Sequence, residues 1–507
     1  MDAKRYHPLN ILFDLSKQVK NLFFPALILF VFNYDSTTAF VTYGRMVFYI
    51  YVGGMLVYLV LRWLSYKFKL DDTSFHLYEG IFTKTKQTIP FTKIQNVNRH
   101  TTLLHRMFQV TSIRFETGMT GDDSAVEFAV ITPQEADRIE EYTKHAVQAE
   151  RVPEQPAHEA SEGETFSHEE IRTQLTTPER IIHFTPTKKE IMKASFTSLS
   201  FLGIITLLVW AYFKLIEFID VEEQVEGIFS LIWSSWTLIT LTAIGLLALS
   251  IVFGMVTTYI RYGKYEISSD HERIYIAKGV IEETTFSISK ERVQGIKIKQ
   301  SLLKRLLGLA EVKLTVVGGE SDTDTDKQDV SSLYPFLPVK RAYEMVSEIL
   351  PAYEVTAEMT SLPKKSLWIR LVRSSWIWII ATGALYYFKP NIWGWEQAWW
   401  IISIALTIVV VTLEVLEFYN TSYTLKNNFI QMQTGHLTTT LFISKREKII
   451  EVNVKRGFLQ KLLGLASIKT VNRAKPVNHK GITDVPIELA EGFYQWYMGR
   501  RKEIKVE

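Results

Sequence analysis

The sequence contains no cysteine among its 507 residues. Disulfide bridges and metal sites built from thiolates are therefore excluded, while the redox compartment is left open. The formal net charge is only +3, which is too small to indicate a nucleic-acid-binding protein. No small-residue cleavage site follows the first apolar run, so we expect no cleavable secretory signal.

Recognisable catalytic and cofactor motifs are also missing. There is no Gly-rich phosphate loop, no convincing nucleophile–base pair, and no ligand spacing among the 11 histidines. The aspartates of "SDTDTDK" (321–327) begin like a calcium loop, but Lys327 stands where that loop needs glycine and Leu333 where it needs glutamate. A solvated hairpin tip is favoured there. We predict no enzyme, no cofactor and no metal, with a spatially assembled triad as the alternative.

One phrase occurs three times in the chain. "QSLLKRLLGLAEV" (300–312) and "RGFLQKLLGLASI" (456–468) are nearly identical, and "TTLLHRMFQVTSI" (101–113) is a weaker copy. A glycine precedes each copy at the same distance, and positions are written below as G+n, counted from that glycine: Gly80, Gly279 and Gly435. Position G+17, for example, holds Val97, Ile296 and Val452. The ungapped match shows a triplicated chain.

Each repeat contains strand and helix patterns. Segments such as "YKFKL", "RIYIAKG" and "EVKLTVVGG" alternate apolar and polar residues, which is typical of half-buried antiparallel strands. Each repeat closes with helical spacing, as in "LPVKRAYEMVSEIL". We therefore predict a small β-barrel or two-sheet sandwich with a C-terminal helix covering its open end.

The repeated phrase itself predicts a short helix. Leu302, Leu303, Leu306 and Leu307 fall on one face, whereas Lys304 and Arg305 lie on the other. Gly308 and Gly464 stand where a helix ends in a left-handed residue. The helix either inserts into a membrane or packs in the core between strands. The core position is favoured, because so short a helix is marginal without tertiary packing.

Long apolar segments separate the repeats. Six of them form three hairpins, each directly before a strand unit: 22–32, 46–64, 201–213, 228–256, 376–388 and 398–411. A bilayer span needs roughly 20 apolar residues, so most of these require semipolar flanks. The three hairpin loops contain only Lys389 as a basic residue, whereas the opposite ends are rich in lysine and arginine. Both termini and all three strand units are predicted to be cytoplasmic.

Hairpins followed by the "LLxRLLGLA" pattern and a closing helix resemble the bacterial pleckstrin-homology-like (bPH) membrane proteins of the YdbT-like kind. The resemblance covers most of the chain apart from residues 150–180. It implies an α+β membrane protein of the bacterial cell membrane, with PH-like domains, no attached catalytic activity, and a shorter one-hairpin relative as partner. The predicted order is hairpin 1–65, domain 66–149, acidic linker 150–180, hairpin 181–264, domain 265–355, hairpin 356–420 and domain 421–503.

Basic residues near the membrane are the lipid-contact candidates. They are Lys188, Lys189, Lys364 and Lys365 at the hairpin starts, and Arg473, Lys475 and Lys480 in the third repeat's basic hairpin tip. Each could attract anionic lipid, although ordinary topology determination is the favoured explanation of the hairpin starts. The corresponding tips of the first two repeats are acidic. Those two domains are therefore expected to contact protein, including one another, by strand addition.

Two acidic residues in the sixth segment, Glu414 and Glu417, lie at membrane depth. Charges there usually face protein or water, so ion pairs with Arg370 and Arg373 of the fifth segment are one hypothesis. Simple exposure at the cytoplasmic interface is the alternative. The predicted function is a non-enzymatic membrane scaffold that binds protein and possibly anionic lipid. A transporter or lipid-handling protein is the alternative, although broken helices and midplane polarity are scarce.

Overall fold

The computed structural model describes residues 3–71, 73–117, 125–151, 180–197, 236–316, 332–389, 398–474 and 477–499. Contacts divide the chain into two compact units, Met1–Arg180 with Tyr275–Ser289, and Ile181–Ile274 with Lys290–Glu507. The division runs through the second repeat, because one strand hairpin of that repeat packs with the first unit. The predicted acidic linker and the "SDTDTDK" tip lie outside the described residues.

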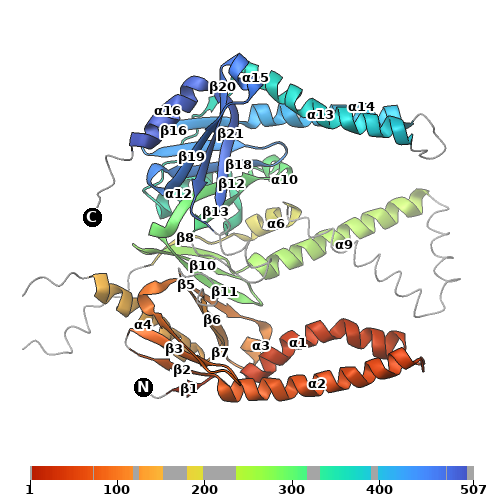
Figure 1. Ribbon diagram of the computed structural model, residues 1–507, viewed down its shortest axis with the longest axis vertical. Coiled ribbons are helices and arrows are strands. Elements are labelled where there is room, and N and C mark those ends of the chain that lie inside the picture. The colour runs from red at the N-terminus through yellow and green to blue at the C-terminus, as the bar shows by residue number, and fades with distance from the viewer. Residues whose placement is uncertain are drawn as a thin grey trace, which may run out of the picture. The chain divides into compact units, whose positions relative to one another are not determined.

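All three repeats share one order of elements (Figure 1). The first consists of β1 (Lys4–Arg5), a helical hairpin, β2 (Lys67–Leu70), β3 (Ser74–Glu79), β4 (Thr85–Pro90), β5 (Ile94–Thr101), α3 (Leu103–Met107), β6 (Thr111–Thr117), β7 (Ala125–Ile131) and α4 (Pro133–Arg151). The second consists of β8 (Ile181–Phe184), a helical hairpin, β9 (Glu266–Ser269), β10 (Arg273–Lys278), β11 (Glu283–Ser289), β12 (Val293–Gln300), α10 (Leu302–Leu306), β13 (Leu309–Val316), β14 (Ser332–Pro338) and α12 (Val339–Ile349).

The third repeat consists of β15 (Thr360–Ser361), a helical hairpin, β16 (Ser422–Lys426), β17 (Phe429–Thr434), β18 (Thr439–Lys445), β19 (Ile449–Lys455), α15 (Phe458–Leu463), β20 (Leu465–Asn472), β21 (Asn478–Pro486) and α16 (Ile487–Met498). A short strand precedes every hairpin and pairs with the first strand after it, as β1 with β2, β8 with β9, and β15 with β16. Each hairpin is therefore an insertion within its PH-like domain, whereas the predicted boundaries placed these strands with the hairpins.

The predicted two-layer core is present in the first and third repeats. In the first, β1-β2-β3-β4 forms one sheet, and aromatic side chains such as Phe75, Phe115 and Phe128 fill the space behind it together with Ile139 of α4. In the third repeat, Phe442, Ile468 and Phe493 of α16 belong to an equivalent cluster. Burial of alternating apolar residues, at roughly 25 cal/mol per Å² of apolar area, stabilises these sandwiches.

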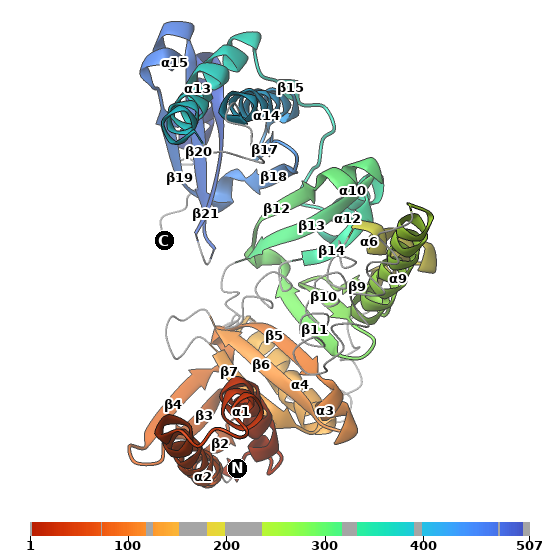
Figure 2. The same cartoon turned by 90° about the vertical axis from the view of Figure 1, so that its right-hand side faces the viewer.

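Neighbouring repeats are joined by antiparallel strand pairing (Figure 2). Strand β5 of the first repeat pairs with β11 of the second, and β12 of the second pairs with β18 of the third. The register is the same in both joints, since position G+17 faces position G+8 of the next repeat: Val97 opposite Ser287, and Ile296 opposite Ile443. One docking rule is thus used twice. The strand addition expected between the first two domains is present.

The helical hairpins are only partly described. The helices α2 (Ala39–Ser65) and α14 (Ala398–Asn420) are long and apolar enough to span a bilayer, and residues Asn10–Phe32 qualify as a pair of helices bent by 49°. The helix α9 (Trp236–Tyr262) contributes a shorter apolar stretch, and α13 (Lys364–Phe388) carries four basic residues near its start. The third predicted segment, 201–213, lies outside the described residues. Six spans therefore stay a prediction.

Candidate functional site

The third repeat closes onto its hairpin through a buried charge cluster. Arg370 of α13 is 1% exposed and lies 3.4 Å from Glu417 of α14 and 3.5 Å from Asp484 of β21. Asp484 is fully buried and also accepts hydrogen bonds from Arg373, at 3.0 and 3.3 Å, and from Gln460 of α15, at 2.6 Å. The carboxylate of Asp484 in β21 therefore links the hairpin helix α13 and the short helix α15 to the sheet.

The ion pairs in this cluster differ in part from the predicted pairs of Glu414 and Glu417 with Arg370 and Arg373. Arg370 lies beside Glu417, as the sequence suggested, but Arg373 pairs with Asp484 rather than with an acid of the sixth segment. Among the described residues, Glu414 has no ion pair or hydrogen bond and one of its oxygens is buried. Asp484 was not predicted, because nothing in the period of β21 marks an inward-facing charge at this position.

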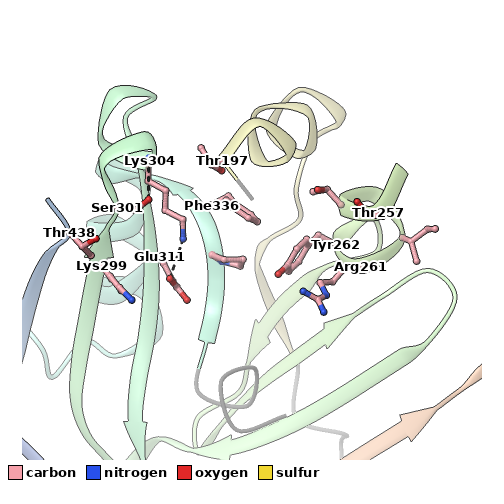
Figure 3. A pocket seen from close by; sticks show the side chains of 13 residues that line it. Thr197, Thr257, Arg261, Tyr262, Lys299, Ser301, Lys304, Glu311, Phe336 and Thr438 are labelled. Carbon is pink, nitrogen blue, oxygen red and sulfur yellow. Dashed lines mark hydrogen bonds and ion pairs between the residues drawn. The ribbon is translucent and has the colours of Figure 1, made fainter. Parts of the chain in front are cut away.

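The corresponding end of the second repeat holds an open pocket (Figure 3). The cavity measures about 660 Å³ and lies between the hairpin helices α6 (Lys188–Thr197) and α9 on one side and β12, α10 and β13 on the other. Its charged lining residues are Arg261, Lys299, Lys304 and Glu311. Its hydroxyl-bearing residues are Thr197, Thr257, Thr258, Tyr262, Ser301 and Thr438.

The single carboxylate of the pocket already has its counterions. Glu311 lies 3.1 Å from Lys304 and 2.9 Å from Lys313. Burial by itself disfavours the charged carboxylate, but the two lysines outweigh it and lower the pKa of Glu311. Burial also lowers the pKa of Lys304, which Glu311 partly restores. Arg261 and Lys299 have no ion pair or hydrogen bond to any residue that the structure describes. The pocket is therefore net basic.

The sequence explains why this pocket is open in one repeat and closed in the other. Helices α6 and α13 both begin with a double lysine, Lys188–Lys189 and Lys364–Lys365. Counted from the first lysine, Arg370 and Arg373 of α13 correspond to Ala194 and Thr197 of α6. In the first repeat, the ring of Phe13 in α1 (Asn10–Ala26) packs at 4.1 Å from His105. Thr197 of α6 thus lines the open pocket at the position where α13 has Arg373.

The three short helices expose their apolar residues, and the predicted core position is wrong. Position G+27 is Met107, Leu306 or Leu462, and these side chains are 73%, 75% and 67% exposed. The neighbouring apolar positions are likewise open: Leu103, Leu104, Phe108, Leu302, Leu307, Phe458, Leu459 and Leu463. The predicted left-handed ends are confirmed at Gly308 and Gly464, with φ of 66° and 69°, and Gln109 adopts this conformation in the first repeat. The helices are fixed by their caps and strands rather than by burial of leucine.

Each short helix lies beside a hairpin helix. Besides the contact of Phe13 with His105 in α3, Arg305 of α10 donates to Asn420 at the end of α14 at 2.8 Å, and Gln460 of α15 shares Asp484 with Arg373. Large apolar faces exposed next to apolar hairpin helices favour a membrane-facing surface. The membrane interpretation of the repeated phrase is therefore the one that the geometry favours.

The lipid-contact candidates divide into two groups. Lys188, Lys189, Lys364 and Lys365 are exposed at the starts of α6 and α13. The third repeat's basic tip is placed elsewhere. Lys480 lies near Lys299, which lowers the Lys480 pKa after the larger effect of burial. Arg473 is exposed beside Asn472, which donates to the Gln294 carbonyl of the second repeat, and Lys475 lies outside the described residues. The tip is thus at the opposite end of β21 from Asp484, and a lipid contact there stays a prediction.

Equivalent strands of the repeats differ in exposure. Strands β5 and β12 are each paired on both edges, but β19 is an edge strand of the sheet β19-β20-β21. Position G+19 is Ile298 in β12 and Val454 in β19, with exposures of 3% and 37%. At position G+15, Ile450 is 53% exposed. An exposed strand edge with apolar side chains is a ready site for another strand.

A basic residue accompanies each joint. Arg106 at G+26 forms a 2.7 Å ion pair with Glu283 and donates to the Val280 carbonyl of the next repeat. Arg305 holds the same position and binds Asn420, whose amide in turn donates to the His436 carbonyl at G+1 of the third repeat. Lys461 occupies G+26 beside β19, is exposed, and has no interaction with any described residue. The third repeat thus keeps the parts of a joint, while no strand that the structure describes covers β19.

The profile of the bacterial PH domain family matches residues 24–147, 201–352 and 372–501. The chain belongs to this family. It is similar over 98% of both chains, at 23% identity, to a protein of Bacillus subtilis (strain 168) called "UPF0699 transmembrane protein YdbT". No solved structure matches it. A bPH transmembrane protein with three repeats is thereby shown, and its family is not a known enzyme class.

Sequence reasoning missed the pocket residues of this bPH protein. Lys304 was placed on the polar face of a short helix, and Lys299 and Arg261 were not singled out. The available signal was the comparison of α6 with α13, in which two arginines are replaced by alanine and threonine. The replacement of two arginines by smaller residues predicts an unfilled cavity only if α6 and α13 are known to pack on the same part of their domains.

Proposed function

We propose that the chain is a non-enzymatic membrane scaffold whose PH-like domains form a continuous docking platform ending in an open strand. The observation that carries this proposal is β19, the uncovered member of a series in which β5 and β12 are covered. Backbone hydrogen bonds supply affinity in strand addition, and alternating side chains supply selectivity. The scaffold holds six spans and keeps both termini and all domains in the cytoplasm.

The partner is a separate polypeptide that carries a PH-like strand, and a shorter one-hairpin relative fits this description. A second copy of the chain fits less well. If β4 of a second copy paired with β19 in the register of the other two joints, Lys84, directly before β4, would lie opposite Arg456. Lys86 would lie opposite Val454. Like charges directly opposite each other destabilise a strand pair, and an unpaired lysine would cover an apolar side chain. Head-to-tail chains of copies are thereby disfavoured.

The partner strand can be described by chemistry. By analogy with β18, it carries apolar residues opposite Val452 and Val454, where Ile443 and Leu441 face Ile296 and Ile298. By analogy with Glu283, it carries an acidic or neutral residue opposite Arg456 and within reach of Lys461.

In-cell photocrosslinking of the full chain tests the partner. A benzoylphenylalanine at Val454 should capture a second polypeptide, and mass spectrometry should locate the adduct on a strand of a PH-like domain. The same probe at Tyr494, which is 51% exposed on α16, is the matched control. Adducts at residues 84–88 of another copy would replace the proposal by self-assembly. Equal capture at both positions, or none, would reject the docking edge.

Thiol labelling tests the topology, because the chain has no natural cysteine. Single cysteines at Thr37, Glu223 and Asn391 should react with an impermeant reagent outside intact cells. Cysteines at Ser124, Asp324 and Asn478 should react only after the membrane is opened. External labelling of any of the last three would overturn the orientation.

The second candidate function is that of a transporter or lipid-handling protein. The basic pocket of the second repeat favours lipid binding over solute transport, since Arg261 lies in the last turn of α9 and its other charged groups lie on the domain.

A further inference from the structure

We propose that the second-repeat pocket binds a phosphate group, supplied by the headgroup of an anionic lipid. The first support is the charge of the lining. Three cations and one carboxylate line the cavity, and the carboxylate is already paired with Lys304 and Lys313. Arg261 and Lys299 remain without an ionic partner among the described residues. Phosphate oxygens prefer such arginine and lysine donors together with hydroxyl groups.

The second support is the supply of neutral hydroxyl groups. Ser301, at the N-cap of α10, and Thr438, directly before β18, lie around the cavity (Figure 3). Figure 3 shows Lys299 and Thr438 on the strand side and Arg261 with Tyr262 on the α9 side, with Lys304 and Glu311 between them. A volume of about 660 Å³ is ample for a phosphate diester and part of its glycerol.

The third support is depth. Arg261 lies in the last turn of α9, at the C-terminal end of the apolar stretch Ala248–Tyr262. On the other side, α10 supplies Lys304 to the pocket while Leu302 and Leu306 are 47% and 75% exposed. An apolar helix face beside a spanning helix rests in the headgroup–acyl boundary. A lipid can therefore place its phosphate in the pocket and its chains along these leucines.

The fourth support is that the site is specific to one repeat. In the third repeat, Arg370 and Arg373 fill the equivalent space and are neutralised by Asp484 and Glu417. Ala194 and Thr197 stand at the corresponding positions of α6. One chain should therefore retain one tightly held anionic lipid. This inference goes beyond the scaffold function and does not depend on a strand partner.

Native mass spectrometry of the full chain released from nanodiscs provides the test. The nanodiscs contain phosphatidylcholine with a minority of phosphatidylglycerol. Wild type should retain one phosphatidylglycerol, and Arg261→Gln/Lys299→Gln should weaken that retention at least tenfold, because each basic residue contributes about 1 kcal/mol. Lys188→Gln/Lys189→Gln removes the same charge from exposed positions at the start of α6 that do not line the pocket, and it should retain the lipid.

A filled-pocket variant gives an independent readout. Thr197→Arg adds charge but copies Arg373, the corresponding residue of α13, so it should reduce retention by occupying the cavity. Equal retention in wild type and all variants would overturn the proposal. Equal losses in the pocket and Lys188/Lys189 variants would also overturn it, since general charge attraction would then suffice.

Two further arms separate a lipid from free phosphate. Inorganic phosphate titrated into the chain in pure phosphatidylcholine nanodiscs should bind at least tenfold more weakly than phosphatidylglycerol. Phosphate binding of equal strength, lost in Arg261→Gln/Lys299→Gln, would overturn the lipid source. A spin label at Leu306→Cys should be accessible to oxygen and shielded from a water-soluble relaxant. Water-like accessibility would contradict the headgroup depth.

Discussion

The second and third repeats are built alike but are open at different places. The second repeat has its acceptor strand β12 covered by β18, yet its junction with the hairpin holds an open basic pocket. The third repeat has that junction closed by Arg370, Arg373 and Asp484, yet its acceptor strand β19 is uncovered. Repeats of one fold can therefore differ in function according to whether the junction with the hairpin or the edge of the acceptor strand is left open.

The largest effect is expected from removing the charge that closes the third junction. Asp484→Asn keeps a residue that tolerates its φ of +64° but leaves Arg370 buried with a weaker counterion. We expect a loss of about 3 kcal/mol in the unfolding free energy of the third domain. Thermal unfolding in detergent, with hydrogen exchange of β20 and β21, measures it.

Glu311→Gln is the matched change in the second repeat and should cost less than about 1 kcal/mol, since its partners are lysines at an open pocket. Equal losses in the two variants would contradict the contrast between the closed and open junctions.

The covered strand depends on a glycine. A Cβ on Gly295 would lie 2.7 Å from the ring of Phe442 and 3.0 Å from the Ile443 carbonyl oxygen across the β12–β18 joint. Gly295→Ala should therefore destabilise this joint by about 1–3 kcal/mol through overpacking. Faster hydrogen exchange in β18 is the readout. Gly492→Ala, in open space on α16, is the control and should be neutral or stabilising.

The charge cluster can be divided by double-mutant cycles. Arg370→Gln and Glu417→Gln should couple by about 1 kcal/mol, because their side chains lie 3.4 Å apart in a buried setting. Arg373→Gln and Glu414→Gln should be additive within about 0.5 kcal/mol, because Arg373 is held by Asp484. Strong coupling of the second pair would restore the pairing that the sequence suggested.

A pH-dependent effect on stability is expected from Lys297 in the β12–β18 joint. Burial, with Lys480 and Lys313 nearby, lowers its pKa from 10.5 to about 8. Between these values the unfolded chain binds more protons, so stability should rise with pH. The stability advantage of Lys297→Met over wild type should shrink from about pH 7 to about pH 9.5. The exposed Lys469→Met should show no such trend, and a widening difference would refute the buried-lysine account.

The fold followed from the sequence where periodicity was the signal. Numbering from the glycine of each repeat aligns Val97, Ile296 and Val452 at position G+17, and all three lie on equivalent strands of their repeats. The left-handed positions of Gly308 and Gly464 were equally readable. What failed was burial of the short helices, because the leucine pattern of α10 fits a core and a membrane surface equally well. Sequence periodicity identifies an apolar face, but it does not tell whether that face is covered by the protein core or by lipid.

The candidate sites could be predicted only in part for a different reason. Arg370 and Glu417 are near each other because adjacent hairpin helices place them so, and hydropathy marked both. Asp484, Arg261 and Lys299 come together through strand pairing and hairpin placement, which are long-range contacts. The short strands β1, β8 and β15 were missed because two to four residues carry too little period to recognise.

Hydrogen exchange of β12 and β19 in the purified full chain tests the central contrast most directly. Both strands have one neighbour within their own domain, β13 or β20, but only β12 has a second one. The amides of β19 that point away from β20 should exchange at least a hundredfold faster than the equivalent amides of β12, since they lack a ladder partner. Equal protection of the two strands in the absence of any partner would contradict the open edge and the scaffold built upon it.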